Sequence, residues 1–233
     1  YLGLERNLNI LVCIKEFFPH NTVNRDNSQS RFVNVNTQTM EGNYASARER
    51  FIREAKSLAK FRDVPQIVSI YELFQMNNTA YMVMEFVAGT DMVKYIHANG
   101  GRLPMNHVMQ LLEPIMTALA QVHDAGLIHR DISPDNLFLT KENKLRLIDF
   151  GSVRTYQGAT SFTTFLKPHF APWEQYKSNG KQGPYTDIYA LSVTVYMLLS
   201  GKMPPRAPDR VAGAQVTPLK TLCPQLPDQV AKA

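Results

Sequence analysis

Five polar residues, spread over most of the chain, are of the types that a phosphoryl transfer requires: Lys15, Glu54, Asp131, Asn136 and Asp149. Such a transfer needs cations on the phosphates, oxygen ligands for a metal ion, and a carboxylate beside the attacking hydroxyl, because the protein contributes mainly positioning and charge. A carboxylate and an amide oxygen suit Mg²⁺, which takes few protein ligands and leaves room for phosphate oxygens. The set therefore predicts a phosphate-transfer site.

Each of these signals also has an ordinary structural explanation when it is taken alone. A lysine in a strand, such as Lys15, usually lies at an edge with its ammonium in water. The triplet Asp149-Phe150-Gly151 can form a simple turn, and a histidine such as His129 is more often a core residue than a functional one. The order in which all of them occur is what favours the functional interpretation.

Composition narrows the class of protein. The chain has 233 residues, enough for one large domain or two small lobes. Its net charge of +5 is scattered, so we expect no nucleic-acid partner and no membrane contact within this chain. Cys13 and Cys223 lack metal or redox spacing, which favours a reducing compartment. We therefore expect a cytoplasmic protein, or the cytosolic part of a larger, membrane-anchored one.

Periodicity predicts the elements of the first part of the chain. "LNILVCIKEFF" predicts a strand over 8–18 that ends at Pro19 and carries Lys15. Polar residues over 20–47 predict a long surface loop, with a short strand at 31–35. The apolar spacing in 46–61 predicts an amphipathic helix, and 67–87 predicts two strands around an Asn-Asn turn.

The second part of the chain shows mainly the apolar spacing of helices. Residues 105–126 predict a long helix, and the run at 187–201 is apolar on all sides and stops at a glycine, which is typical of a buried core helix. We expect an α+β fold of two lobes: a small β-rich lobe over 1–88 and a larger α-helical lobe over 89–233.

Seven segments resemble one known family: "IKEFFP", "RFIREAKSLAKF", "TAYMVMEF", "HRDISPDN", "LIDFG", "APWEQY" and "GPYTDIYAL". Over nearly its whole length the chain resembles a eukaryotic-type protein kinase, specifically the bacterial serine/threonine kinase branch. The resemblance implies ATP as the phosphate donor, Mg²⁺ with Mn²⁺ as a substitute, and protein substrates.

The resemblance also implies a role for each polar residue. Lys15 would pair the α- and β-phosphates, and Glu54 would hold Lys15 by an ion pair. Asp131 would accept the proton of the substrate hydroxyl. Asn136 and Asp149 would each bind a metal ion.

A second group of residues would bind the nucleoside by the same resemblance. Cys13 would form the roof of the adenine pocket, Phe138 its floor, and Met84 its gatekeeper, although core packing alone would also explain all three. By the same resemblance, backbone groups of Glu85 and Val87 would contact the adenine, and Asp91 would contact the ribose.

One position departs from the family pattern. Ser133 stands where most serine/threonine kinases carry a lysine that touches the γ-phosphate, and losing that cation should weaken transition-state stabilisation. Lys167 falls about where many kinases have a threonine that contacts the missing lysine. We expect that the two positions have exchanged partners, so that Lys167 reaches back toward Ser133 and Asp131. The alternative is a surface lysine that points to solvent.

Residues 149–174 resemble an activation segment whose phosphate Arg130 would receive. The candidate acceptors are Thr163 and Thr164, followed by Thr160 and Ser161, although ordinary loop hydroxyls are an equal alternative. Autophosphorylation of this segment in trans would require two copies of the chain to associate. Asp187 would hydrogen-bond the backbone of the catalytic loop and could also cap its helix.

The resemblance is incomplete at both ends. The glycine-rich phosphate loop is expected upstream of residue 1 or is absent, and the last helices of the larger lobe are not reached. The expected activity is serine/threonine protein kinase. One alternative is a pseudokinase or nucleotide-binding scaffold, favoured by Ser133 and by the missing glycine-rich loop. A small-molecule phosphotransferase is another alternative, and a preference for tyrosine also stays open.

Overall fold

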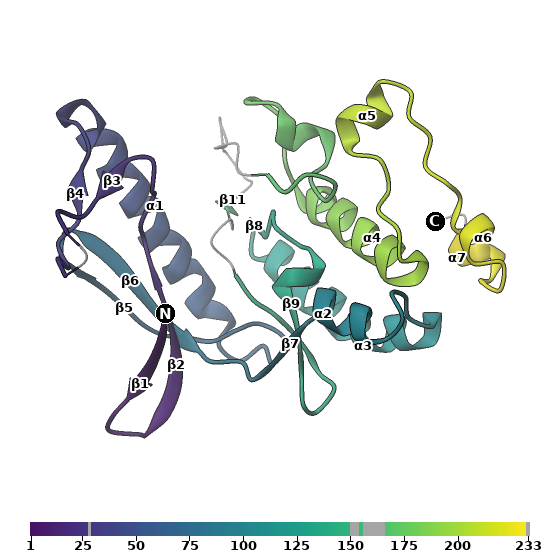
Figure 1. Ribbon diagram of the computed structural model, residues 1–233, viewed down its shortest axis with the longest axis horizontal. Coiled ribbons are helices and arrows are strands. Elements are labelled where there is room, and N and C mark those ends of the chain that lie inside the picture. The colour runs from purple at the N-terminus through teal and green to yellow at the C-terminus, as the bar shows by residue number, and fades with distance from the viewer. Residues whose placement is uncertain (28, 150–153, 156–165, 232–233) are drawn as a thin grey trace. The chain divides into compact units, whose positions relative to one another are not determined.

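The chain folds into two compact units, residues 1–87 and 88–233, in a computed structural model that describes residues 1–27, 29–149, 154–155 and 166–231. The first unit holds a sheet and one long helix, and the second is mainly helical with several short strands (Figure 1). The predicted α+β class is therefore confirmed, as is the order of a small sheet-rich part followed by a larger helical part.

A four-stranded antiparallel sheet in the order β1-β2-β6-β5 forms the first unit. Its strands are β1 (Leu2–Glu5), β2 (Ile10–Glu16), β5 (Ile70–Met76) and β6 (Thr79–Glu85). Asn77 and Asn78, with φ of 53° and 60°, connect β5 to β6, as a two-residue turn with two left-handed residues requires. The predicted Asn-Asn hairpin is thus confirmed.

Helix α1 (Glu41–Leu58) packs on the face of the sheet that carries Lys15. Its Phe51 and Ala55 form a buried cluster with Ala80 and Met82 of β6. Met82 is the cross-strand partner of Lys15, and cross-strand partners point to the same face. The helix and the lysine are therefore brought to one side of the sheet.

The start of α1 and the segment before it differ from the prediction. The helix begins at Glu41, well before Ser46, because Tyr44 is buried: its ring lies 5.5 Å from that of Phe17, and its hydroxyl donates to the Asn78 carbonyl at 2.7 Å. The expected loop over 20–47 contains three short elements: β3 (Val23–Asn24), β4 (Asn34–Val35), which lies within the predicted short strand at 31–35, and the 3₁₀-helix η1 (Gln38–Met40). Val23 of β3, Val35 of β4 and Val33 pack with Tyr44.

Helices α3 (Met105–Asp124) and α4 (Pro184–Ser200) dominate the second unit. Helix α3 is confirmed within two residues. Helix α4 ends at Gly201, as predicted, but it is not buried on every side, since Tyr185 is 55% and Ile188 is 51% exposed. The remaining elements are short: η2 (Ala59–Phe61) in the first unit, and in the second β7 (Gly89–Asp91), α2 (Met92–Ala98), β8 (Leu127–Ile128), η3 (Pro134–Asn136), β9 (Leu137–Thr140), β10 (Leu145–Leu147), β11 (Arg154–Thr155), η4 (Trp173–Tyr176), α5 (Ala207–Val211), α6 (Leu219–Leu222) and α7 (Asp228–Ala231).

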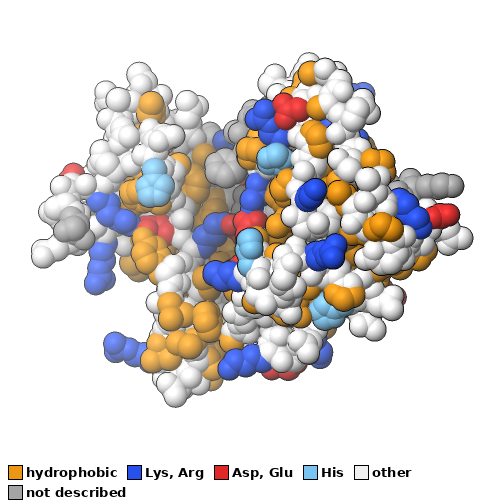
Figure 2. Space-filling model, turned by 45° about the vertical axis from the view of Figure 1, so that its right-hand side comes forward, with side chains coloured by type: hydrophobic (Ala, Val, Ile, Leu, Met, Phe, Trp, Pro, Cys, Tyr) orange, Lys and Arg blue, Asp and Glu red, His pale blue; other side chains and the backbone are white. Residues whose placement is uncertain are grey.

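Two small antiparallel sheets carry the loops of the second unit. One has the order β10-β9-β7, and the other pairs β11 with β8. The residues between β8 and β9 are the predicted catalytic loop. On the face drawn in Figure 2, the described Lys and Arg side chains lie scattered among hydrophobic and polar ones. In the part of the chain that the structure describes, no helix is both long and apolar enough to cross a bilayer.

Candidate phosphate-transfer site

A buried carboxylate from α4 holds the backbone of the loop between β8 and β9. Asp187 accepts hydrogen bonds from the backbone N–H of His129 at 2.8 Å and of Arg130 at 2.7 Å. Arg130 has φ of 71°, a left-handed conformation that costs a non-glycine residue energy and that these bonds stabilise. The predicted link between Asp187 and the loop is confirmed. Its predicted capping role is wrong, because α4 begins at Pro184 and Gly183 is its N-cap.

His123 of α3 completes this anchor. Its Nε2 lies 2.8 Å from the Asp187 carboxylate, whose side chain is fully buried. A buried carboxylate is costly unless it is hydrogen-bonded, and here its partners lie at the end of α3 and in the loop after β8, 57 to 64 positions before Asp187 in the sequence. Two helices therefore fix the loop that carries Asp131. His123 was not predicted, because it lies among apolar helix residues without a recognisable motif.

Asp131 and Asn136 lie in direct contact within this loop. The Asn136 amide nitrogen donates to the backbone carbonyl of Asp131 at 2.7 Å and to its carboxylate at 2.9 Å. The N–H of Ile148 donates to the Asn136 carbonyl at 2.9 Å, which brings the following residue, Asp149, to the same region. Asp131, Asn136 and Asp149, which all carry side-chain oxygens, therefore lie in one region.

The donor set at this point suits a hard divalent cation. Because both hydrogen bonds of Asn136 come from its amide nitrogen, its side-chain oxygen is the atom that can accept a cation. Together with the Asp149 carboxylate it offers an amide and a carboxylate oxygen, the ligand types that Mg²⁺ takes when phosphates supply the others. Among the described residues there is no cluster of three or more His, Cys, Asp or Glu that would hold a metal without a substrate.

Lys167 reaches the catalytic loop from the segment that precedes η4. Its ammonium donates to the Ser133 hydroxyl at 2.9 Å and forms an ion pair with the Asp135 carboxylate. Ser133 is fully buried, while the side chains of Lys167 and Asp135 are 32% and 47% exposed. The predicted approach to Ser133 is present. Asp135 was not predicted, although a carboxylate immediately before Asn136 was a readable signal.

The charges around Asp131 act on its acidity. Burial is the largest influence and raises the pKa of Asp131, while the Lys167 ammonium and the hydrogen bond from Asn136 lower it. The carboxylates of Asp149 and Asp135 raise it again, and the net pKa lies above the ordinary value. The charge of Lys167 therefore reaches Asp131 although its direct partners are Ser133 and Asp135.

The first unit carries the residues predicted to bind the nucleotide. Lys15 and Cys13 alternate with buried Val12 along β2, and Cys13 is the cross-strand partner of Met84. The same face continues over Leu2 and Leu4 of β1 and Leu11 of β2, which are 64%, 55% and 48% exposed. An exposed apolar strip thus lies beside the lysine, on the face over which α1 with Glu54 packs.

The remaining residues that were predicted to contact the nucleoside are divided between the two units. Glu85 donates its N–H to the Ser69 carbonyl at 2.9 Å and accepts from the Ser69 N–H at 3.3 Å, and Val87 is the last residue of the first unit. In the second unit Asp91 and Phe138 are cross-strand partners. Their contacts with a nucleoside stay predictions.

Asp91 has a structural role that was not predicted from the sequence. Its carboxylate caps α2 by accepting from the N–H of Lys94 at 2.9 Å, and it pairs with the Lys94 ammonium at 2.8 Å. Burial raises the pKa of Asp91, but the bonds to Lys94 outweigh it and the net pKa is lowered.

The predicted phosphate acceptors Thr160, Ser161, Thr163 and Thr164 lie outside the described residues, as do Phe150 and Gly151. Beyond them, Gln175 of η4 donates to the buried Arg130 carbonyl at 3.1 Å. This contact joins the segment after Lys167 to the catalytic loop and was not predicted from the sequence.

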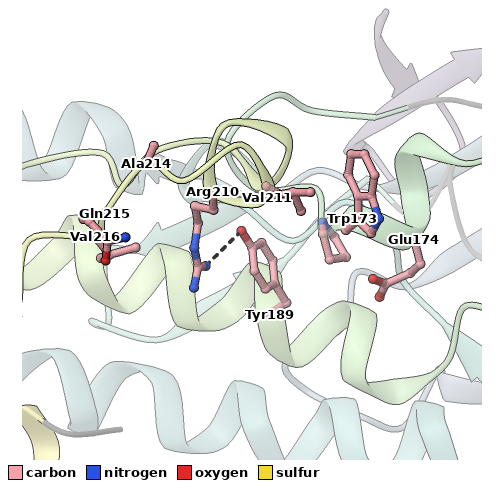
Figure 3. A pocket seen from close by; sticks show the side chains of 10 residues that line it. Trp173, Glu174, Tyr189, Arg210, Val211, Ala214, Gln215 and Val216 are labelled. Carbon is pink, nitrogen blue, oxygen red and sulfur yellow. Dashed lines mark hydrogen bonds between the residues drawn. The ribbon is translucent and has the colours of Figure 1, made fainter.

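A cavity of about 560 Å³ lies elsewhere in the second unit (Figure 3). Trp173 and Glu174 of η4, Tyr189 of α4 and Arg210 of α5 line it, and Arg210 donates to the Tyr189 hydroxyl at 3.4 Å. The residues that line it include none of the set around Asp131 and Lys167. The cavity is therefore distinct from the candidate site.

Most of the chain matches one known protein family. A family model described as "Protein kinase domain" matches residues 21–222. The chain is similar to the serine/threonine-protein kinase PrkC of Bacillus subtilis (35% identity over 66% of this chain and 24% of that protein). It is also similar to the serine/threonine-protein kinase PknL of Mycobacterium tuberculosis (30% identity over 73% of this chain and 43% of that protein). It therefore spans less than half the length of these curated relatives.

A solved structure, "PpkA-294 apo form", has a similar fold. It matches with a TM-score of 0.81 and 29% sequence identity, over 99% of this chain and 81% of that one.

Proposed function

The chain belongs to the protein kinase domain family, and we propose that it transfers the γ-phosphate of ATP to serine or threonine hydroxyls of proteins. Use of ATP and a divalent metal ion is general in this family. The observation that supports activity most directly is the contact between Asp131 and Asn136 beside Asp149, because proton acceptor and metal ligands must share one site.

In this proposal the chain's own residues divide the work of transfer. Asp131 accepts the proton of the attacking hydroxyl, and the hydrogen bond from Asn136 orients its carboxylate. The side-chain oxygens of Asn136 and Asp149 would hold Mg²⁺, with Mn²⁺ as a substitute, and the bound metal would neutralise charge on the phosphates. Lys15 of the first unit pairs the α- and β-phosphates, and Glu54 of α1 holds Lys15.

Lys167 supplies the cation that Ser133 cannot. Its bond to Ser133 places the ammonium in the loop of Asp131, where it can stabilise negative charge on the transferred phosphate. A pseudokinase is less well supported, since each predicted proton- and metal-handling position is occupied by a suitable residue and the loop carries a replacement cation.

The nucleoside end of ATP fits the first unit by its chemistry. The exposed apolar strip beside Lys15 offers a surface for a flat base next to a cation for phosphates, with Cys13 and Met84 on the same face. Asp91, Phe138 and the backbone of Glu85 and Val87 complete the proposed contacts. A bacterial, cytosolic setting and self-association for autophosphorylation in trans belong to the same proposal.

An autophosphorylation assay of the full-length protein with labelled ATP and Mg²⁺ tests this function. We expect incorporation into serine or threonine that disappears in Asp131→Asn and survives in Asp124→Asn, a matched change at an exposed helix end. Phosphosite mapping would distinguish Thr160, Ser161, Thr163 and Thr164, and phosphoamino-acid analysis would detect tyrosine. ATP binding without incorporation, into itself or an added protein, would support the nucleotide-binding scaffold instead.

A further inference from the structure

The segment that carries Lys167 is held against the second unit by its own backbone. The N–H groups of Phe170 and Ala171 donate to the Lys167 carbonyl at 3.2 and 3.0 Å, which closes a turn. Phe170 and Ala171 are 8% and 2% exposed, so this turn is anchored by buried side chains. The backbone at Lys167 is thereby fixed, but a lysine side chain with four rotatable bonds needs acceptors to adopt one position.

Two acceptors of different character hold the ammonium. Ser133 contributes a buried, neutral hydroxyl, and Asp135 contributes a half-exposed carboxylate. Both belong to the stretch around η3, and Asn136 is the next residue. Because a hydrogen bond to a charged acceptor is roughly twice as strong as one to a neutral acceptor, the bond to the Asp135 carboxylate is the stronger of the two.

We propose that Asp135 is a positioning residue for phosphate transfer, which keeps the Lys167 ammonium in the loop of Asp131 without itself touching the phosphates. This inference rests on the proposed function. The usual arrangement places the cation within the catalytic loop itself, where its position follows from the loop. Here the cation comes from another segment, so the loop must contain a partner that holds it.

Steady-state kinetics of the full-length protein test the positioning role. Asp135→Asn keeps the shape of the side chain and removes its charge, and we expect kcat to fall about two- to fivefold, the range of a partly exposed ion pair, with KM for ATP unchanged. Asp135→Glu should restore most of the rate. In a Lys167→Ala background, Asp135→Asn should have no further effect, because the side chain that it positions is gone.

The expected results differ if Asp135 affects only the structure, or if it acts independently of Lys167. If Asp135→Asn lowers kcat by the same factor with and without Lys167, or leaves kcat unchanged, the proposal is wrong. Asp124→Asn serves as the control for a change of net charge at an exposed site of the same unit.

Chemical labelling provides a second readout that does not depend on catalysis. Brief acylation of the folded protein with a lysine-reactive ester, followed by mass spectrometry, compares Lys167 with the exposed Lys141. Asp135→Asn should accelerate labelling of Lys167 about two- to fivefold relative to Lys141. Unchanged labelling would overturn the contact itself. If the wild type transfers no phosphate but the labelling ratio rises, the proposed function fails while the ion pair stands.

Discussion

Ser133 and Lys167 lie in contact although 34 positions separate them in the sequence, and this is the contact that the proposed replacement of the loop lysine requires. In this proposal the cation and its partner exchange segments, and the ammonium, bound to Ser133 and Asp135, still lowers the pKa of Asp131 by its charge. At the residue scale, what matters for transfer is where the charge lies, and the segment that supplies it can vary.

Removing this charge should affect the rate of transfer more than nucleotide binding. We expect Lys167→Ala to lower kcat about ten- to a hundredfold, since a lost transition-state donor typically costs that much or more, and to leave KM for ATP unchanged. Steady-state kinetics with a fixed protein substrate measure both. Lys167→Thr should be comparably slow, and adding Ser133→Lys should recover part of the rate. Full activity in Lys167→Ala would contradict the exchange.

Asp187 offers a stability test of the same loop. Asp187→Ala leaves the N–H groups of His129 and Arg130 buried without their acceptor, at about 1–3 kcal/mol each. We expect the free energy of unfolding to fall by about 2–5 kcal/mol, measured by chemical denaturation. Asp124→Ala, at an exposed helix end of the same unit, is the control and should change the free energy of unfolding far less. Equal effects at the two sites would mean that Asp187 does not anchor the loop.

At the scale of elements, the end of α4 depends on one glycine for two reasons. Gly201 has φ of 70°, in the left-handed region that terminates helices, and a Cβ there would lie 2.6 Å from the carbonyl oxygen of Gly101. Helix α4 carries Asp187, so the position of this helix end bears on the loop that Asp187 holds.

Gly201→Ala should therefore destabilise the protein by more than the ~1 kcal/mol of a left-handed alanine alone. Gly42→Ala is the matched control, because Gly42 lies in the first turn of α1 and a Cβ there meets nothing within 4 Å. That change should stabilise by about 0.4–1 kcal/mol. Thermal and urea unfolding of both variants would measure the contrast, and a neutral Gly201→Ala would refute the steric argument.

Local pattern was sufficient for most elements but not for their beginnings. The strand that carries Lys15, the Asn-Asn hairpin and helix α3 each show their own period in the sequence, and each was predicted correctly. The early start of α1 was not predictable, because it depends on Tyr44 packing against Phe17, the residue that follows β2. The exposed side of α4 was missed for a related reason, since hydrophobicity alone does not say which side has neighbours.

At the scale of the whole molecule, one ion pair in the first unit should make stability depend on pH. Glu16, whose side chain is 3% exposed, accepts from the Arg25 guanidinium at 2.5 Å, and that guanidinium lies 4.7 Å from the centre of the Phe18 ring. Burial raises the pKa of Glu16, but hydrogen bonds from Arg25, Tyr81 and Tyr1 outweigh it, and the net pKa is lowered.

A lowered folded-state pKa means that Glu16 contributes stability above its unfolded value of about 4.5, and that this contribution is lost as pH falls through the folded value. We expect Arg25→Met to cost about 1–3 kcal/mol at pH 7 and progressively less from pH 5 to pH 3. Urea unfolding at several pH values measures the difference. Arg62→Met, at an exposed position, should show little effect at any pH. A constant cost for Arg25→Met would indicate lost packing rather than the ion pair.

The sequence by itself determined the fold class and predicted the class of chemistry. The order of the lysine, glutamate, aspartates and asparagine implied phosphate transfer, and local periodicity implied a sheet-rich part before a helical one, because both signals are carried by neighbouring residues. The tertiary structure decided which distant groups meet. Asp135 holds Lys167, His123 and Asp187 anchor the catalytic loop, and Gln175 holds Arg130, since each contact joins separate segments whose approach depends on packing and leaves no periodic trace in the chain.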